Sequence, residues 1–536
     1  MRSLFAAVLL FAALGIGLSA QPVIRTTNGV LNAASYAQQG MPNSAIAQGS
    51  IFTVFGTGLG PAVLQEYSSF PVSSMLGGTT VNVAANGTTV QAPMIFTTAT
   101  QVAAIMPSTT PVGNATVSVT YENATSGTYP IQVVASSFGT FAVNEQGNGT
   151  GIITNADGDV FLADSAALPG DSATIWGTGI GPLPYSDADM PKATNLTNIP
   201  VKLYVGGQLV STSYQGPSTC CAGVNQIVFK VPAGVTGCSV PVEVSINNVV
   251  SPTTTMPIGS DSSRVCSDPN GIPSSILQAL LSKPSFNLGT VSLSRTTATL
   301  LNTSTDTGSA VFFNIKPLEF AGATSFQKAA IGSCIVNSIS ESAETTVFSG
   351  FTGLDAGPFI DVNGPGGTQE LAPLAGITGV YASTNGTTPF LTPGAYTASG
   401  TGGAAVGPFS VDMTVANPIT WTNEASIGTV DRASGVTVTW TGGAPGTYAT
   451  ISGTSFLIGS SLLITTFTCQ APIAQGTFTV GPDVLLQLPA STSVAGIGLA
   501  TLSVGNNEPY VEFTATGLDY GFAQSSVSIS ASVTYQ

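Results

Sequence analysis

The sequence contains no histidine, and only 7% of its 536 residues are charged. Without an imidazole, no histidine base can activate a serine or cysteine nucleophile, and no histidine can transfer protons or ligate a metal. The run Gly170-Asp171-Ser172 resembles the start of an esterase block, but without that base it is interpreted as a turn. Serine–histidine and cysteine–histidine hydrolases are therefore excluded.

Basic residues are also scarce. The chain has 11 lysines and arginines against 26 aspartates and glutamates, which gives a net charge of -15. Such a chain has no basic footprint for nucleic acid, and anionic lipid surfaces would repel it. Its hydrophobic content of 43% excludes a disordered chain of low hydropathy and high charge. A chain of this length is expected to form about three or four domains.

The longest apolar run lies within residues 1–20. Arg2 precedes an apolar stretch from Leu4 to Leu18, and the small residues Ser19-Ala20 follow it. This order predicts a secretory signal peptide over residues 1–20. The stretch is shorter than the ~20 apolar residues of a membrane-spanning helix, so a membrane anchor is the weaker alternative. We expect an exported protein with no transmembrane segment after cleavage.

Cysteines are few but even in number, which in an exported protein predicts three disulfides. The common zinc spacings are absent because there is no histidine and no C-x-x-C pair. Neighbouring Cα atoms lie ~3.8 Å apart, below the usual disulfide range, so adjacent cysteines are not expected to bond. Fifteen pairings remain open in principle. The preferred one is Cys221–Cys238, Cys220–Cys266 and Cys334–Cys469.

An internal repeat is the strongest pattern in the chain. The segment from Gly49 to Pro61 recurs from Gly170 to Pro182, and both carry a Gly-Thr-Gly turn before a Gly-Pro pair. Further on, Gln101–Pro107 parallels Gln226–Pro232. Two-residue turn signals such as Asn86-Gly87 indicate hairpins. Two units with many short strands predict two immunoglobulin-like β-sandwiches, at residues 21–140 and 141–260, the second containing the cysteine cluster.

Beyond the repeats, two prolines that bound an apolar segment predict one helix. Pro273 stands near its start and Pro284 after its end, within a linker at 261–284. Residues 285–536 then alternate as strands again, without the earlier motif. We divide them weakly into β domains at 285–415 and 416–536. A Cys334–Cys469 bond would link these two halves covalently, so one larger sandwich-like unit is equally compatible with the pattern.

Residues of roughly 30 to 260 resemble a known family. The segments Val30–Tyr36, Phe55–Pro61 and Gln101–Pro107, with Cys220–Ile227 in the second copy, resemble exported bacterial proteins that carry the uncharacterised Solibacter-type C-terminal domain. That domain is similar to IPT/TIG immunoglobulin-like modules. The resemblance implies an Ig-like sandwich that is secreted or held in the cell envelope of a bacterium. It implies no catalytic residues and no particular ligand.

Two motifs invite a cofactor or metal interpretation. Gly56-Thr57-Gly58-Leu59-Gly60 has the wrong spacing for a dinucleotide-binding G-x-G-x-x-G, and Pro61 stands where a helix should begin. The second motif offers oxygen ligands to calcium and is the weak candidate metal site, comprising Asn155, Asp157, Asp159 and Asp164. An Asp-Gly hairpin turn is the favoured interpretation, because the glutamate of an EF-hand loop is missing. No cofactor is expected.

Paired carboxylates are the enzymatic route left open, because glycosidases need two of them and no histidine. The C-terminal half offers eight candidates, namely Glu319, Glu341, Glu344, Asp355, Asp361, Glu370, Glu508 and Glu512. Trp176 is expected in the core of the second repeat. Trp421 and Trp440 are expected to pack as well, although exposed and coplanar rings would make a sugar-binding surface.

The sequence therefore predicts an all-β protein: tandem Ig-like β-sandwiches followed by a further β-sandwich-rich C-terminal region. The first hypothesis for function is a secreted or cell-surface, non-catalytic protein for adhesion, binding or envelope structure. Its partner would be an extracellular protein or a glycan. The alternative is a carbohydrate-active enzyme or carbohydrate-binding protein that uses residues 285–536.

Overall fold

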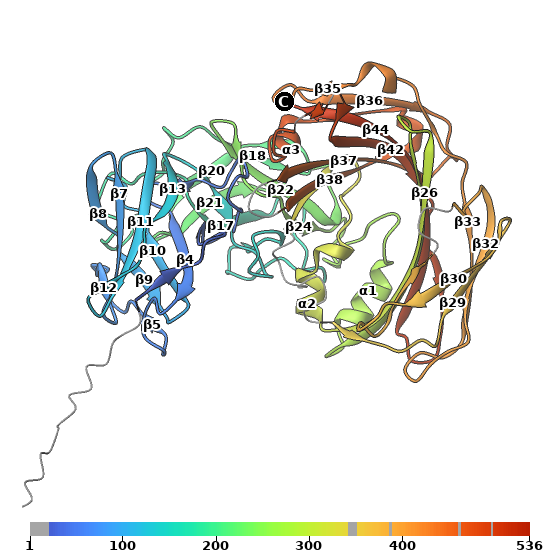
Figure 1. Ribbon diagram of the computed structural model, residues 1–536, viewed down its shortest axis with the longest axis horizontal. Helices are drawn as coiled ribbons and strands as arrows, with labels where there is room; N and C mark the ends of the chain where they lie inside the picture. The colour runs from blue at the N-terminus through green and yellow to red at the C-terminus, as the bar shows by residue number, and fades with distance from the viewer. Residues whose placement is uncertain (1–20, 341–350, 385–388, 459–461, 492, 495–496) are drawn as a thin grey trace, which may run out of the picture.

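The computed structural model describes residues 21–340, 351–384, 389–458, 462–491, 493–494 and 497–536. Within these residues the protein is nearly all β, as predicted. Two β-sandwiches, which we call repeat 1 and repeat 2, lie beside a larger C-terminal unit built on one strongly curved sheet (Figure 1). The predicted signal peptide lies outside the described residues.

Repeat 1 is an Ig-like sandwich of two sheets. One sheet has the order β1-β4-β10-β9-β5, with β2 also paired to β4, and the other has the order β3-β13-β11-β7-β6, with β8 and β12 at its side. Alternate residues such as Phe52, Val54, Val81, Val83 and Val117 face each other between the sheets and are fully buried. The strands are β1 (Val23–Ile24), β2 (Val30–Asn32), β3 (Ile46–Ala47), β4 (Ile51–Thr57), β5 (Gln65–Glu66), β6 (Met75–Leu76), β7 (Thr79–Ala85), β8 (Thr88–Gln91), β9 (Met94–Thr97), β10 (Gln101–Ile105), β11 (Gly113–Tyr121), β12 (Ala124–Thr125) and β13 (Tyr129–Val134).

Repeat 2 has the same topology, which is what the internal sequence repeat predicts. Its sheets have the orders β14-β17-β21-β20 and β15-β24-β22-β18-β19. In both repeats a short strand pairs in parallel with the last strand, as β3 with β13 and β15 with β24. Repeat 2 begins at β14, slightly before the expected boundary at 141. Its strands are β14 (Gly139–Thr140), β15 (Gly149–Thr150), β16 (Ile153–Thr154), β17 (Ser172–Thr178), β18 (Val201–Val205), β19 (Gln208–Val210), β20 (Thr212–Pro217), β21 (Asn225–Lys230), β22 (Gly237–Ile246), β23 (Val249–Val250) and β24 (Thr254–Ile258).

The repeated glycines have a packing reason. A Cβ atom on Gly56 would lie 2.1 Å from the backbone oxygen of Val23, and one on Gly177 would lie 2.2 Å from that of Gly139. Val23 and Gly139 belong to β1 and β14, which pair with β4 and β17 at these glycines. The first glycine of the Gly-Thr-Gly motif thus lets an edge strand approach the sheet.

The C-terminal unit consists of one long sheet with smaller elements packed on it. The sheet has the order β27-β38-β37-β42-β44-β25-β26-β31-β30-β29-β32-β33, so it contains strands from both sides of residue 416. The division drawn there from the sequence does not separate two sheets. The strands are β25 (Phe286–Ala298), β26 (Thr303–Ile315), β27 (Cys334–Ser340), β28 (Thr352–Gly353), β29 (Ile360–Gly364), β30 (Gly367–Pro373), β31 (Val380–Ser383), β32 (Gly394–Gly400), β33 (Phe409–Val415), β34 (Thr420–Trp421), β35 (Thr429–Val430), β36 (Val436–Thr441), β37 (Tyr448–Ile458), β38 (Leu462–Pro472), β39 (Thr477–Val480), β40 (Ser493–Val494), β41 (Ile497–Gly498), β42 (Ala500–Asn507), β43 (Val511–Phe513) and β44 (Tyr520–Tyr535).

Helices cover the concave side of this sheet (Figure 1). The predicted linker helix is confirmed as α1 (Ser274–Leu281), which buries Leu277 and Leu280. Leu280 packs on Phe286 and Leu288 of β25. The short α2 (Pro317–Gly322) and α3 (Pro482–Leu485) contact repeat 2 as well as the sheet.

Repeat 2 is bound on both sides. Toward repeat 1, Thr178 Oγ1 accepts a 2.9 Å hydrogen bond from the amide of Ile51. Toward the C-terminal unit, Thr150 Oγ1 donates to the carbonyl of Ala321 at 2.6 Å, and Gln327 Nε2 donates to Thr255 Oγ1 at 3.0 Å. The outer face of this sheet is therefore covered by protein along β22 and β24, whereas Lys202 on β18 stays exposed.

Candidate functional site

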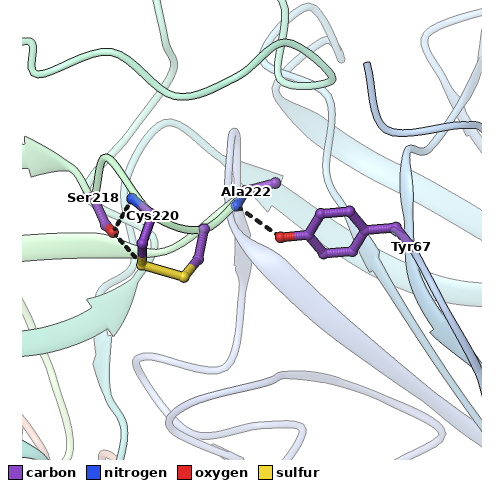
Figure 2. Close-up of a disulfide and its surroundings, with 5 residues drawn as sticks. Tyr67, Ser218, Cys220 and Ala222 are labelled. Carbon is purple, nitrogen blue, oxygen red and sulfur yellow. Dashed lines mark hydrogen bonds between the residues drawn. A yellow bond between two sulfur atoms is a disulfide. The ribbon is translucent and has the colours of Figure 1, made fainter. Parts of the chain in front are cut away.

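The structure corrects two of the three expected disulfides. Cys334 and Cys469 are bonded, as predicted, because they stand directly opposite each other on β27 and β38. The expected Cys221–Cys238 and Cys220–Cys266 bonds are wrong. Cys238 instead bonds Cys266 of the linker, and the adjacent Cys220 and Cys221 bond each other (Figure 2).

The loop between β20 and β21 explains the unexpected bond. It turns toward repeat 1, where the amide of Ala222 donates to the hydroxyl of Tyr67 (Figure 2). Ala222 is buried there among apolar residues of repeat 1 such as Ile51 and Ile105. Cys220 and Cys221 are thus held away from Cys238, which begins β22 beside the linker. The vicinal disulfide belongs to the contact between the repeats.

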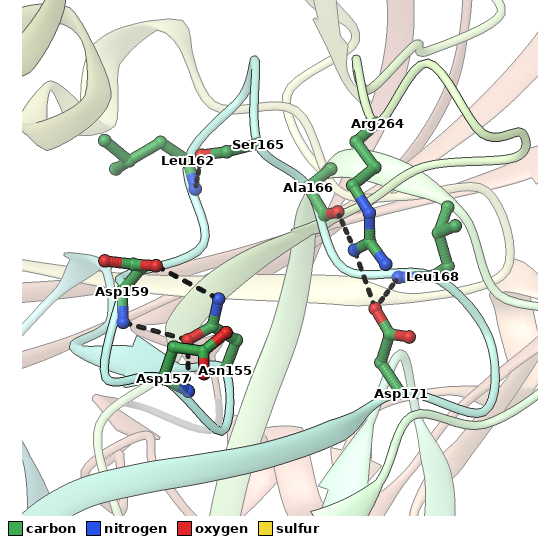
Figure 3. Close-up of polar contacts among 9 residues, drawn as sticks. All are labelled: Asn155, Asp157, Asp159, Leu162, Ser165, Ala166, Leu168, Asp171 and Arg264. Atoms are coloured by element: carbon green, nitrogen blue, oxygen red, sulfur yellow. Dashed lines mark hydrogen bonds and ion pairs between the residues drawn. The ribbon is translucent and has the colours of Figure 1, made fainter.

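The weak calcium candidate is a hydrogen-bonded turn. Asn155 Oδ1 accepts hydrogen bonds from the amides of Asp157 and Asp159, both at 2.9 Å (Figure 3). Its Nδ2 donates to the Asp159 carboxylate, so the side chain presents a donor where a metal site needs an oxygen. Asp164 lies exposed in the following segment. Across the described part of the chain, no group of three or more Cys, Asp or Glu side chains is placed to hold a metal.

Asp171, from the run that resembles an esterase block, has a structural partner. Its carboxylate accepts a 2.7 Å hydrogen bond from Arg264 Nη1 and one of 3.0 Å from the amide of Leu168 (Figure 3). The Arg264 guanidinium, above all, holds the pKa of this carboxyl below its usual range. Asp171 therefore fastens the segment after β24 to the entry of β17.

Of the expected carboxylates, Asp361 and Glu370 are brought together as register partners on β29 and β30, outside the lining of any cavity described here. Glu341 and Glu344 lie outside the described residues. Asp355 caps a turn through the amide of Gly357, and Glu319 pairs with Lys316. Trp421 and Trp440 are register partners on β34 and β36 and are 5% and 2% exposed, so the predicted packing is confirmed and their rings form no exposed sugar-binding surface. Trp176 lies only partly buried on the outer side of β17, not in the core, and donates to Thr154.

A cavity of about 240 Å³ lies where repeat 2, the linker and the C-terminal unit meet. Its walls are mainly apolar, because α1, α2 and β25 turn leucine and phenylalanine side chains toward one another. Besides the hydroxyl residues Thr150 and Ser239, its polar groups come from distant parts of the chain: Asp164, Asp268, Gln327, Lys328 and Tyr510. The apolar lining includes Leu162, Ile272, Leu277, Leu281, Leu288, Leu318, Phe320 and Phe522.

Lys328 is the cation of this cavity. Its ammonium lies 3.6 Å from the centre of the Tyr510 ring, and it donates to Gln524 Oε1 at 3.1 Å and to the Asn270 carbonyl at 3.2 Å. Burial lowers its pKa to about 7, which the nearby Asp268 carboxylate opposes only in part. Burial also raises the pKa of Asp268 to about 6, although the Cys238 amide donates to it.

Two polar side chains at the cavity keep hydrogen-bonding capacity. Gln327 Oε1 is buried and has no hydrogen-bond partner in the described part of the protein. Asp268 accepts one bond through Oδ1, from the Cys238 amide at 3.1 Å. A buried acceptor without a donor is costly, so Gln327 Oε1 favours a ligand that brings a hydroxyl or an amine, and Asp268 can accept a further hydrogen bond from the same ligand.

Lys328 is expected to be the most reactive lysine near neutral pH. A pKa of about 7 leaves the amine largely unprotonated at pH 7.5. The unprotonated fraction is then several hundred times, roughly, that of a lysine with an ordinary pKa. Limited acetylation with acetic anhydride, followed by peptide mass spectrometry, should label Lys328 at least about tenfold faster than exposed Lys202. Equal labelling of the two lysines would contradict this assignment.

Sequence reasoning missed this cavity because its polar groups come from four separate stretches of chain. Asp268-Pro269-Asn270-Gly271 reads as a turn in a linker, and Lys328 and Tyr510 stand in unremarkable loops. The one available signal is the scarcity of lysine and arginine. With so few cations, a lysine followed by two alanines, as in Gln327-Lys328-Ala329-Ala330, is a candidate for burial.

Comparisons with known proteins add little to this geometry. No protein-family model and no curated protein matches the sequence. Solved structures match at low similarity. A titin I-band fragment, I67–I69, is 10% identical and covers 72% of this chain and 98% of its own, with a TM-score of 0.11. At such a score the likeness carries no argument about a ligand or a role.

Two surface glycan-binding proteins, both named SGBP-B, match equally weakly. The one from a Bacteroides ovatus mixed-linkage glucan utilization locus is 11% identical, covers 82% of this chain and 91% of its own, and has a TM-score of 0.15. The one from a Bacteroides uniformis xyloglucan utilization locus is 10% identical, covers 68% and 86%, and has a TM-score of 0.16. Neither match bears on this cavity. In the described chain, no helix has both the length and the hydropathy to cross a membrane.

Proposed function

We propose that this protein is an exported, non-catalytic binding protein that holds a small, largely apolar ligand in the cavity beside Lys328. The observation that carries the proposal is the cavity itself, where about 240 Å³ of apolar-walled space contains a few converging polar groups. That combination is typical of ligand sites. Leu318 lines the cavity and is still 60% exposed, which is apolar surface that a ligand at the mouth would cover.

The ligand chemistry follows from the lining. An apolar body fits against the leucine and phenylalanine walls, and one hydroxyl or amine fits Asp268 and Gln327. Lys328 already has two acceptors and an aromatic ring, so it serves mainly to position these groups. Export and membership of the Solibacter-type family are part of the same proposal, supported by residues 1–20, the disulfides and the Ig-like repeats.

Thermal shift and native mass spectrometry test this function with apolar alcohols and amines, and with oligosaccharides as a second panel. Binding is expected to raise the unfolding midpoint by a few degrees at saturation. Ala163→Phe, which fills the cavity, should abolish the shift. Lys283→Met, which removes an exposed lysine paired with Asp519, is the matched control and should leave it unchanged. A ligand that binds Ala163→Phe and the unaltered protein equally would refute the cavity as the site.

A second candidate, carbohydrate hydrolysis, is favoured by one observation. Asp164 and Asp268 line the same cavity, and the pKa of Asp268 is raised as a general acid requires. Among the described residues, none of the eight carboxylates expected for paired-carboxylate catalysis lines it. Turnover on a polysaccharide panel that is lost in Asp268→Asn would support this function, and an inactive protein with a bound apolar ligand would end it.

A further inference from the structure

Glu243 is a fully buried carboxyl at the contact between repeat 2 and the C-terminal unit. On β22, Val242 and Val244 face the core of repeat 2, so Glu243 points to the opposite sheet face. That face would meet solvent in an isolated sandwich. Here the segment containing α3 covers it, and Glu243 is 1% exposed.

Oxygen atoms from both units surround this carboxyl. Thr253 Oγ1 lies 3.0 Å from Glu243 Oε1 and 3.1 Å from Gln487 Oε1. Gln487 follows α3, and its Oε1 also accepts a 3.0 Å hydrogen bond from the Thr253 amide. Asp483, within α3, is close enough for its charge to act on Glu243. Tyr204 on β18 is the register partner of Glu243.

The cluster lacks a compensating charge. In the described chain, neither Glu243 nor Asp483 forms an ion pair with a lysine or arginine. Glu243 Oε2 is buried without any hydrogen-bond partner among the described residues. A buried carboxyl beside a second, partly buried one, without a counter-charge, needs either a proton or a cation.

We propose that Glu243, Asp483, Thr253 and Gln487 hold a calcium ion that joins repeat 2 to the C-terminal unit. Carboxylate, amide and hydroxyl oxygens are the ligands of this hard cation, and the unpartnered Glu243 Oε2 is the oxygen that it would satisfy. The proposed site is separate from the Asn155 turn and from the Lys328 cavity. A failure of the ligand proposal would therefore leave the calcium proposal unaffected, and the reverse also holds.

Calcium titration of the full exported protein tests the site. We expect binding with a dissociation constant of about 10⁻⁴ to 10⁻³ M, as in extracellular calcium modules. Millimolar calcium should raise the unfolding midpoint by a few degrees, whereas Glu243→Gln and Asp483→Asn should not respond. Asp157→Asn/Asp159→Asn is the matched control, which removes two carboxylates from the Asn155 turn and should keep the full response.

Terbium provides a second measurement if either site variant fails to fold. Terbium in the site should be excited through Tyr204, and Tyr204→Phe should lower that emission while the calcium response persists. The proposal is overturned if calcium leaves the midpoint of the unaltered protein unchanged. It is also overturned if the response survives in both Glu243→Gln and Asp483→Asn. An unresponsive protein that Glu243→Gln stabilises without calcium would show that a proton fills this role.

Discussion

Replacing both Cys334 and Cys469 by alanine is expected to lower the free energy of unfolding of the C-terminal unit by about 5 kcal/mol. The bond joins residues 135 positions apart, so it removes a large loop-closure entropy from the unfolded chain. Both cysteines are also buried in the core beneath β34 and β36, where alanine leaves a small void. Guanidinium unfolding followed by tryptophan fluorescence measures the change, because Trp421 and Trp440 lie in that core.

The other two disulfides are internal controls for this explanation. Cys238–Cys266 closes a separation of 28, so its double alanine variant should lose about 3.5 kcal/mol. Cys220–Cys221 closes no loop beyond one peptide unit, so its removal should leave global stability nearly unchanged. If the three variants lost equal stability, loop entropy could not be the dominant cause.

A fragment of residues 285–415 is expected not to fold. Leu288 to Ala298 of β25 pair in parallel with Tyr520 to Ser530 of β44, which this fragment lacks. The core around Val291 and Leu293 is also completed by Ala523 and Val527 of β44. Far-ultraviolet circular dichroism should therefore show no cooperative thermal transition, whereas residues 285–536 should show one.

Residues 21–284 serve as the control for this experiment. Apart from Ala330, the buried core residues of both repeats lie within this range, and Cys238 keeps its partner Cys266. This fragment is expected to fold and to melt cooperatively. A cooperative melt of 285–415 alone would mean that the shared sheet is not required.

The sequence predicts the repeats well because their determinants are local. Phe52 and Val54 alternate on β4 as Ala173 and Ile175 do on β17, and each strand ends in the same glycine turn. The repeated pattern therefore yields the same two-sheet topology twice. The C-terminal unit was less predictable, since nothing in β25 indicates that its parallel partner lies more than 200 residues later.

The sites were not predictable for a related reason. Alternation along β22 places Glu243 on a solvent face, and only the docking of the C-terminal unit buries it. Lys328, Asp268 and Tyr510 converge through three separate loops. The Cys220–Cys221 bond is not expected from the spacing of neighbouring Cα atoms, although the loop between β20 and β21 accommodates it.

The parallel pairing of β25 and β44 has a mechanical consequence. β25 is the first strand of the C-terminal unit and β44 the last, and the two lie side by side. Tension applied between residues 286 and 535 would pull these strands past each other along their length. All the backbone hydrogen bonds between the two strands would then bear the force at once, instead of breaking one after another. The unit would therefore act as a shear clamp in a tethered chain.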